Sequence, residues 1–523
     1  MRLTILSAIC FVTFFSAHAQ VPTLDWQSAL GGSAYDQAES VVETFDGGCV
    51  VAGIATSTDG DVTGNHGFGD YWIVKLDSFG ILQWENTYGG SADEAALAVM
   101  QTSDSGYAIA GGSTSSDGDA TFNHGFNDFW VIKTDADGNI QWQKSLGGSS
   151  TDIAYDIREV TDGGYIVAGY TQSNDGDITS HHGSEDCWIV KLDSAGTIQW
   201  QNTYGGNKEE RVQQILQTLD GGYIASGFTK SNDDDVSGNH GDYDYWIFKI
   251  DSIGNLEWQH TYGGTKSDQC YAISQTSDHH YVAAGFTESS NGDVTSNHGS
   301  QDVWLIMIDS VGNLEWEKSL GGSGGDFAYD VKQNLAGDLI VGATSFSTNG
   351  DVSGNHGGED YWTIKTDLSG NIIWESSFGG SSVDEADAIA ATDNGYIVAG
   401  GTLSNDGDVT GNHGDFDYWV IKISDAIATS APFDSEQNES LSLQISPNPF
   451  IQAAKIIYNL PADSYVSIDI LSVTGQKISA LYDGYMGKGN HTYSLSRQND
   501  QPGMYLVRVI TDNKTIIKKV IEN

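Results

Sequence analysis

The sequence predicts an all-β protein: a seven-bladed β-propeller closed by its N-terminal strand, followed by a small Ig-like β-sandwich. A segment of the form W-x-x-x-aromatic/Leu-Gly-Gly recurs every 58 residues, beginning at Trp26, Trp84, Trp142, Trp200, Trp258, Trp316 and Trp374. A second tryptophan series keeps this interval until a final step of 57, at Trp72, Trp130, Trp188, Trp246, Trp304, Trp362 and Trp419. Glycine is abundant (64 residues) and proline scarce (6), which favours short strands joined by tight turns.

Each period contains four predicted strands. In the third repeat they span 154–160, 164–171, 186–193 and 197–204, with glycine-containing turns after the first and the third. Four strands per unit favour a propeller, because its closed ring leaves only short sheet edges. A β-solenoid is the alternative, although its coils are usually shorter than this period and need caps.

The two ends of the repeat array distinguish these folds. The array opens with a lone strand of the fourth type, 24–30, and ends with a lone strand of the third type, 417–424. In a ring the opening strand completes the last blade, whereas a solenoid gives no reason for this arrangement. We therefore expect the two strands to pair.

The first 19 residues have the pattern of a secretion signal peptide. Arg2 supplies the positive charge, 3–15 is mostly apolar, and Ala17-His18-Ala19 predicts cleavage between Ala19 and Gln20. No later stretch has the length of a transmembrane helix. We therefore expect an exported protein without a transmembrane segment, with a propeller over 20–425, a polar linker over 426–443 and a second domain over 444–523.

Three cysteines remain after cleavage: Cys49, Cys187 and Cys270. Each replaces a different residue of the repeat, so they are isolated changes at strand positions. We expect buried thiols and neither a disulfide framework nor a metal cluster.

The chain is strongly acidic, with 71 Asp and Glu against 23 Lys and Arg and a net charge of −48. From residue 441 onward basic residues slightly outnumber acidic ones, so the negative charge belongs to the repeats. A field of this sign repels nucleic acid and anionic lipid and favours cations and solubility. We expect no nucleic-acid partner.

Part of the repeat resembles a known family. Tyr204-Gly205-Gly206, the segment 218–224 and Tyr245-Trp246 are similar to the SBBP-type β-propeller repeats of secreted bacterial proteins. The resemblance covers most of the chain and implies the fold. It implies no particular activity, because one fold hosts many functions.

The C-terminal module alternates apolar and polar residues in short strands, as an Ig-like sandwich does. Its ordered motifs are Pro447-Asn448-Pro449, Gly475, Gly503 with Tyr505, and Lys518-Lys519. These resemble the type A sorting domain of the type IX secretion system of Bacteroidota. The resemblance implies the type IX secretion machinery as a partner, passage across the outer membrane of a Gram-negative bacterium, and release or lipopolysaccharide anchoring at the surface. A carbohydrate-binding or adhesive sandwich is the alternative, but it lacks an exposed aromatic cluster.

Two sets of acidic residues are predicted at one face of the ring, if the first strand of each blade lines the axis. One set starts each blade and forms a candidate ligand-binding rim: Asp36, Glu94, Asp152, Glu210, Asp268, Asp326 and Asp384. The other lies in the loop between the second and third strands: Asp59, Asp61, Asp117, Asp119, Asp175, Asp177, Asp233, Asp235, Asp293, Asp351, Asp406 and Asp408.

The second set has competing interpretations. Calcium takes six to eight oxygen ligands, and these loops are rich in carboxylates and carbonyls, so they are candidate calcium sites. The spacing is not that of an EF-hand, however, and Asn291 and Asn349 replace the first Asp in two blades. Short polar side chains also bond their own turn backbone, which favours structural turns. Direct contact with a ligand is the third interpretation.

One histidine recurs in each of these loops: His66, His124, His182, His240, His298, His356 and His413. An enzyme site needs one unique constellation, so sevenfold recurrence favours loop packing. The departures from symmetry at 208–211, 233–235, 181–182 and 278–280 form no recognisable acid/base pair, nucleophile triad or metal-ligand set. We therefore name no catalytic residue.

These patterns favour a non-catalytic binding or scaffold protein for a glycan, a protein or a cation. A secreted carbohydrate-active enzyme of the glycoside hydrolase kind, with its site in the propeller funnel, is the alternative, and a purely structural or adhesive propeller is the third. One blade with paired acids unlike those of the other six, converging on a central pocket, would favour the enzyme. Sevenfold symmetry in the pocket would count against it.

Overall fold

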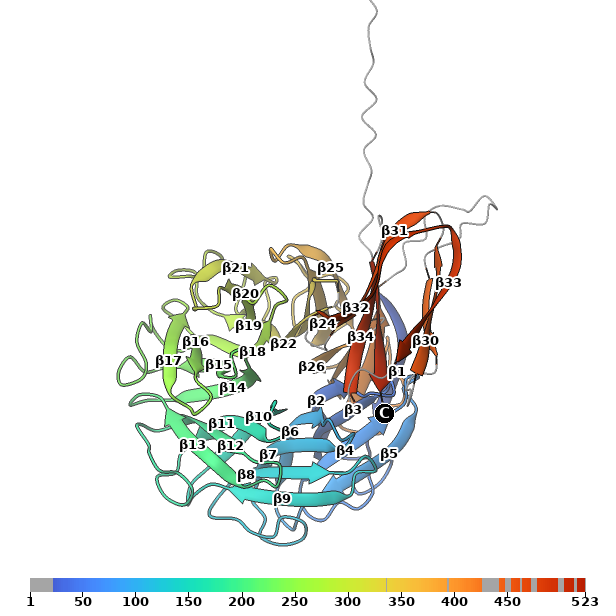
Figure 1. Cartoon of the computed structure of the whole chain (residues 1–523). Helices are drawn as coiled ribbons and strands as arrows, with labels where there is room; N and C mark the ends of the chain where they lie inside the picture. Colours follow the sequence, from blue (N-terminus) through green and yellow to red (C-terminus); the bar gives the residue numbers. More distant parts are fainter. Residues whose placement is uncertain are drawn as a thin grey trace, which may run out of the picture.

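The computed structural model describes residues 22–334, 336–392, 395–425, 442–446, 453–460, 463–471, 477–496, 503–511 and 515–522. All regular structure in these ranges is β, and Figure 1 shows its larger part as a ring of blades around a central axis. Seven four-stranded antiparallel sheets make up the ring. The predicted seven-bladed propeller is therefore confirmed. The signal peptide and its cleavage site lie outside the described residues.

The blades follow one another along the chain, each with its first strand nearest the axis (Figure 1). The first blade consists of β2 (Asp36–Glu43), β3 (Cys49–Ala55), β4 (Asp70–Leu76) and β5 (Leu82–Tyr88), and the second of β6 (Glu94–Gln101), β7 (Tyr107–Ser113), β8 (Asp128–Thr134) and β9 (Ile140–Leu146). The third consists of β10 (Asp152–Glu159), β11 (Tyr165–Thr171), β12 (Asp186–Leu192) and β13 (Ile198–Tyr204), and the fourth of β14 (Glu210–Gln217), β15 (Tyr223–Thr229), β16 (Asp244–Ile250) and β17 (Leu256–Tyr262). The fifth consists of β18 (Asp268–Gln275), β19 (Tyr281–Thr287), β20 (Asp302–Ile308) and β21 (Leu314–Leu320), and the sixth of β22 (Asp326–Gln333), β23 (Leu339–Ser345), β24 (Asp360–Thr366) and β25 (Ile372–Phe378).

The seventh blade combines both ends of the array. Its strands are β26 (Asp384–Thr392), β27 (Gly395–Thr402), β28 (Asp417–Ser424) and, as the outer strand, β1 (Thr23–Leu30). β1 pairs antiparallel with β28, with Gln27 opposite Ile421, and the Trp419 indole N–H donates to Gln27 Oε1 at 3.0 Å. The predicted closure of the ring is confirmed, and it removes the edge that β28 would otherwise expose.

The two tryptophan series have different packing roles. The series on the third strands, which includes Trp72 and Trp419, is fully buried between neighbouring blades. The other series lies on the outer strands, where Trp26 donates its indole N–H to the Ser78 carbonyl at 3.2 Å and packs over Gly80. Gly80 has φ +77°, and a Cβ there would lie 2.5 Å from the Trp26 ring, so only glycine suits this turn. Cys49, Cys187 and Cys270 are free and buried, as expected.

The C-terminal residues form a two-layered β-sandwich, as predicted. One sheet has the order β29 (Ser442–Ser446), β30 (Ala453–Leu460) and β33 (Gly489–Ser496), and the other has the order β32 (Lys477–Met486), β31 (Ser464–Leu471), β34 (Gly503–Thr511) and β35 (Thr515–Glu522). Its core contains Ile456, Val466, Ile468, Val507 and Val520.

The predicted sorting motifs are only partly described. Pro447-Asn448-Pro449 and Gly475 lie outside the described residues. Gly503 begins β34, Tyr505 is buried and Lys518 of β35 is exposed. Lys519 lies on β35 as well. The ranges that the structure describes hold no helix of the length and apolarity that crossing a membrane requires.

Candidate functional site

The acids that start each blade are buried where one blade passes to the next. Asp36 accepts the Gly32 N–H on Oδ2 at 2.9 Å and the Thr56 and Ser57 N–H groups on Oδ1 at 3.0 and 3.1 Å. Burial raises the pKa of this carboxyl, and these hydrogen bonds oppose the rise. The seven side chains are 0 or 1% exposed: Asp36, Glu94, Asp152, Glu210, Asp268, Asp326 and Asp384. They hold the blade junctions together, and ligand binding by them stays a prediction.

The loops between the second and third strands, called the Asp-Gly-Asp loops after Asp59-Gly60-Asp61, also make hydrogen bonds to these blade junctions. Asp59 Oδ1 accepts the Ser33 N–H at 2.7 Å, and Asp61 Oδ2 accepts the Gly31 N–H at 3.3 Å. In two blades Asn291 or Asn349 takes the place of the first Asp. Their side-chain amide oxygens accept the equivalent backbone N–H, at 3.0 and 2.9 Å. A neutral oxygen is therefore sufficient at this position, which supports the interpretation as structural turns.

The other predicted calcium ligands occupy equivalent places in their blades. They accept backbone N–H groups of the Gly-Gly segment or of the residue after it. At the first position of the loop these residues are Asp117, Asp175, Asp233 and Asp406. At the second position they are Asp119, Asp177, Asp235, Asp293, Asp351 and Asp408. In the described ranges no three His, Cys, Asp or Glu side chains are arranged to hold a metal ion. Calcium binding here stays a prediction.

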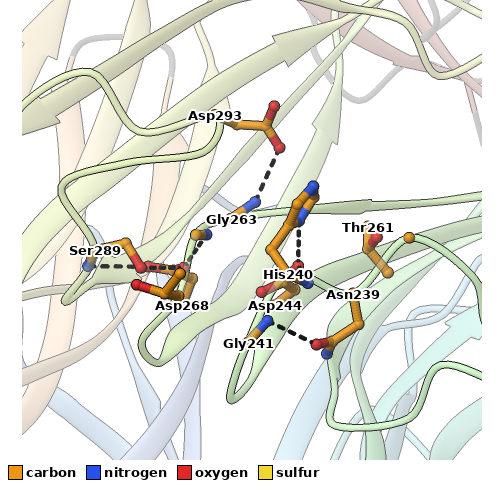
Figure 2. A network of polar contacts seen from close by, with 12 residues as sticks. Asn239, His240, Gly241, Asp244, Thr261, Gly263, Asp268, Ser289 and Asp293 are labelled. Atoms are coloured by element: carbon orange, nitrogen blue, oxygen red, sulfur yellow. Dashed lines mark hydrogen bonds and ion pairs between the residues drawn. The ribbon is translucent and has the colours of Figure 1, made fainter.

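Each loop histidine is anchored by the aspartate that starts the third strand. Figure 2 shows the pair in the fourth blade, where His240 Nδ1 lies 2.6 Å from Asp244 Oδ2. Asp293 of the next blade accepts the Gly263 N–H in the same network. The pair recurs in all seven blades. The histidines therefore serve loop packing.

The inner strands surround a cavity of about 570 Å³ on the axis, and each strand carries one β-bulge that faces it. The pairing register shifts at the same point in every inner strand, for example between Ala38 and Ser40. A bulge adds one residue to a strand and re-aims its side chain. The bulged residues form one ring of cavity-lining side chains: Glu39, Leu97, Tyr155, Gln213, Tyr271, Tyr329 and Asp387.

This ring breaks the sevenfold symmetry of the fold. The residues just before the bulges are Ala, Val or Cys and are 0 or 1% exposed, so they pack between blades. The bulged residues themselves are acidic in blades seven and one, apolar in blade two, and tyrosine in blades three, five and six. The wall of the cavity therefore differs from blade to blade.

Four acids from three consecutive blades gather at one side of the ring. Glu39 and Asp387 line the cavity, Glu385 lies two residues before Asp387, and Glu359 directly precedes β24. The charge of Glu385 acts on Glu39, Glu359 and Asp387, as it does where carboxyl groups lie close together. Gln37 donates its amide N–H to Asp387 Oδ2 at 2.5 Å. We call the four acids Glu39, Glu359, Glu385 and Asp387 the acidic arc.

Burial and mutual repulsion raise the pKa values in the acidic arc. The pKa of Glu39 rises to about 7 through burial and the charge of Glu385. The pKa of Glu359 rises to about 8 through burial and its interaction with Glu385. Burial, Glu39 and Glu385 raise the pKa of Asp387 well above its usual value. At neutral pH the arc therefore holds protons as well as negative charge.

Aromatic rings form other parts of the cavity wall and pack behind it. Tyr271 and Tyr329 have ring centroids 5.3 Å apart, and Tyr155 stacks on Tyr170 at 6.0 Å. Arg211 lies over the Tyr170 ring at 4.5 Å. Its guanidinium is held by Glu185, with Nε 2.6 Å from Oε2.

A site in the propeller funnel was part of the enzyme hypothesis, but the residues that line this cavity were not predicted. None of the asymmetric segments 208–211, 233–235, 181–182 and 278–280 lines it; Arg211 lies behind the wall, over the Tyr170 ring that stacks on Tyr155. The bulged residues are Glu, Leu, Tyr, Gln, Tyr, Tyr and Asp and follow a nearly constant small residue, but this variation indicates a cavity only once the strand register shows that these side chains face it.

Known proteins resemble the chain in part. The family profile of the secretion system C-terminal sorting domain matches residues 444–523. A search of curated proteins gave no match.

Solved structures resemble the fold at low sequence identity. BBS1N in complex with ARL6DN is 12% identical over 79% of this chain and 99% of that one, with a TM-score of 0.43. PorZ, a bacterial surface component of the type IX secretion system of Porphyromonas gingivalis, is 14% identical over 91% and 73%, with a TM-score of 0.27. An ulvan lyase of polysaccharide lyase family PL25 is 10% identical over 90% and 98%, with a TM-score of 0.32. These scores carry no argument about function, and the propeller assignment rests on the strand pairing.

A sorting domain of this family directs secretion to the cell surface or outer membrane in Bacteroidota. The part of the chain that this domain exports is the propeller that precedes it. The chain is a seven-bladed β-propeller that carries a C-terminal sorting domain of the type IX secretion system over residues 444–523.

Proposed function

We propose that the exported propeller is a binding protein whose ligand occupies the axial cavity. The observation that carries this proposal is the ring of bulged residues, in which one repeated backbone feature presents seven mostly different side chains to one cavity. Ligand pockets combine a concave surface, aromatic faces and a few polar groups, and this cavity has all three. The outer loops instead use their acids for backbone hydrogen bonds.

The carbohydrate-active enzyme is the second candidate, and the acidic arc is the observation that favours it. A glycosidase needs two carboxyl groups separated by about 5 Å or by about 6.5–9.5 Å. Glu39 and Asp387 are the acids of the acidic arc that line the cavity, so they are the pair that such an enzyme would use. Gln37 already donates an N–H to Asp387 Oδ2 at 2.5 Å, which occupies one of these two carboxyl groups, and we therefore place binding first.

A capture experiment tests the proposal. The purified protein is immobilised and exposed to soluble polysaccharides and peptide mixtures, and retained molecules are identified by mass spectrometry. We expect retention that Tyr271→Ala abolishes and that the exposed-site double variant Asp137→Asn/Asp234→Asn preserves. Equal retention by all three proteins would overturn the cavity as the site, and turnover of any polymer would favour the enzyme.

A further inference from the structure

The charges around the cavity are unevenly balanced. Each basic side chain near it already has its own acid: Arg158 Nε lies 3.1 Å from Asp156, and Lys332 Nζ lies 2.5 Å from Asp330. Arg211 is paired with Glu185. In the part of the chain that the structure describes, no Lys or Arg pairs with any member of the acidic arc. The fold therefore supplies four carboxyl groups and no cation to match them.

A buried acceptor without a donor lies in the same place. Gln37 is 3% exposed, and its amide nitrogen donates to Asp387. Its Oε1 has no hydrogen-bond partner and faces Gly401, which is paired with Glu385 across β26 and β27. An orphaned buried acceptor costs about 1–3 kcal/mol. Gln37 is not among the residues that line the cavity, and its contribution there is to hold the Asp387 carboxyl through its amide nitrogen.

The aromatic side chains of the cavity wall determine which kind of cation fits it. Tyr155, Tyr271 and Tyr329 line the cavity, and the charges of Glu39 and Asp387 act on Tyr155 and Tyr329 respectively. Aromatic faces attract organic cations, which carry apolar surface as well as charge. A metal ion needs several oxygens converging on one point, and the described residues hold no such group of acidic or histidine side chains.

We propose that the axial cavity binds an organic cation, an aliphatic amine or a guanidinium group, between the acidic arc and the three tyrosines. This inference rests on the proposed function, because it names the ligand class of the same cavity. The ammonium or guanidinium group ion-pairs with Glu39 and Asp387, and its methylene groups lie against the tyrosine rings. Binding displaces protons from the arc, because a cation favours the ionised carboxylates.

Isothermal titration calorimetry with spermidine tests the inference on the whole protein at 150 mM salt. Triethylene glycol serves as an uncharged probe of similar length, and calcium chloride as a metal probe. We expect spermidine to bind with proton release, seen as a dependence of the heat on the buffer's ionisation enthalpy, and to bind about tenfold more weakly for each pH unit below 7 per proton displaced.

Two charge-matched variants separate the cavity from the acidic surface. Glu39→Gln/Asp387→Asn is expected to weaken spermidine binding at least about tenfold and to abolish proton release. Asp137→Asn/Asp234→Asn removes two exposed carboxylates on outer turns and is expected to change neither. Equal losses in both variants would mean diffuse attraction to a protein of net charge −48 and would overturn the inference.

The remaining outcomes distinguish this inference from the function it rests on. Binding of neutral saccharides that is lost with Tyr271→Ala, with no response to spermidine, overturns the organic cation and leaves the cavity as a binding site. Binding of calcium that Glu39→Gln/Asp387→Asn abolishes also overturns it. If neither cavity variant changes the binding of a ligand of any class, both proposals are overturned.

Discussion

The Tyr418 hydroxyl donates a hydrogen bond to the Trp72 carbonyl at 2.9 Å, although the two residues are 346 positions apart. The bond joins the last blade to the first, and both side chains are fully buried. Tyr71 and Trp130 make the same bond between the first and second blades, also at 2.9 Å. The junction that closes the ring therefore repeats the geometry of a junction inside the chain.

Tyr418→Phe and Tyr71→Phe are expected to lower the free energy of unfolding by similar amounts, about 1 kcal/mol each, because each removes one buried hydrogen bond. Chemical denaturation of both variants checks this. A loss at Tyr71 with none at Tyr418 would show that the closing junction is not formed as described.

The Asp-Gly-Asp loops need an oxygen acceptor and no charge at their first position. Asp233 accepts the Asn207 N–H at 3.0 Å, so Asp233→Ala is expected to cost about 1 kcal/mol of stability and Asp233→Asn less than half of that. Thermal unfolding of the two variants provides the comparison. Equal losses would indicate a role for the charge, as a metal site requires.

A chelator tests the calcium interpretation directly. The loop carboxylates already accept backbone N–H groups, so we expect EDTA to leave the melting temperature unchanged. A ligand that binds only the folded state raises its stability. A fall of several degrees on chelation, reversed by calcium, would therefore establish a bound ion.

The acidic arc is expected to cost stability at high pH. The folded-state pKa of Glu39 is about 7, above the value of about 4.3 for an unperturbed glutamate. Folding therefore favours the protonated form, and this contribution is full below pH 4 and is lost as pH rises through 7.

Glu39→Gln removes that dependence. We expect the variant to be more stable than the wild type by on the order of 1–2 kcal/mol above pH 7.5, with the difference vanishing near pH 4. Denaturation curves at several pH values measure it. A variant less stable than the wild type at pH 8 would show that Glu39 has a stabilising partner.

The repeat pattern was sufficient to predict the fold. The repeats have a constant length of 58 residues, and the array begins with a fourth-type strand and ends with a third-type strand, which fits a closed ring. Trp72 and its equivalents are core residues in every blade, so periodicity alone places them. The roles of Asp36 and Asp59 were harder to predict. Both were expected in loops at the surface, yet Asp36 is the buried first residue of β2 and Asp59 accepts a backbone N–H.

The cavity could not be located from patterns of this kind. Glu39 and Asp387 are 348 positions apart in the sequence and become neighbours only through ring closure. A bulge also gives no clear signal in a sequence, since it depends on the pairing register of two strands. Residue types that vary between repeats are therefore informative only after the register is known.

The most direct test of this account is a crystal structure of the protein with a captured ligand. The account predicts ligand density in the axial cavity, in contact with Glu39 or Asp387 on one side and Tyr155 or Tyr271 on the other. Ligand density confined to the outer loops around Asp59 and its equivalents, with only water in the cavity, would contradict it.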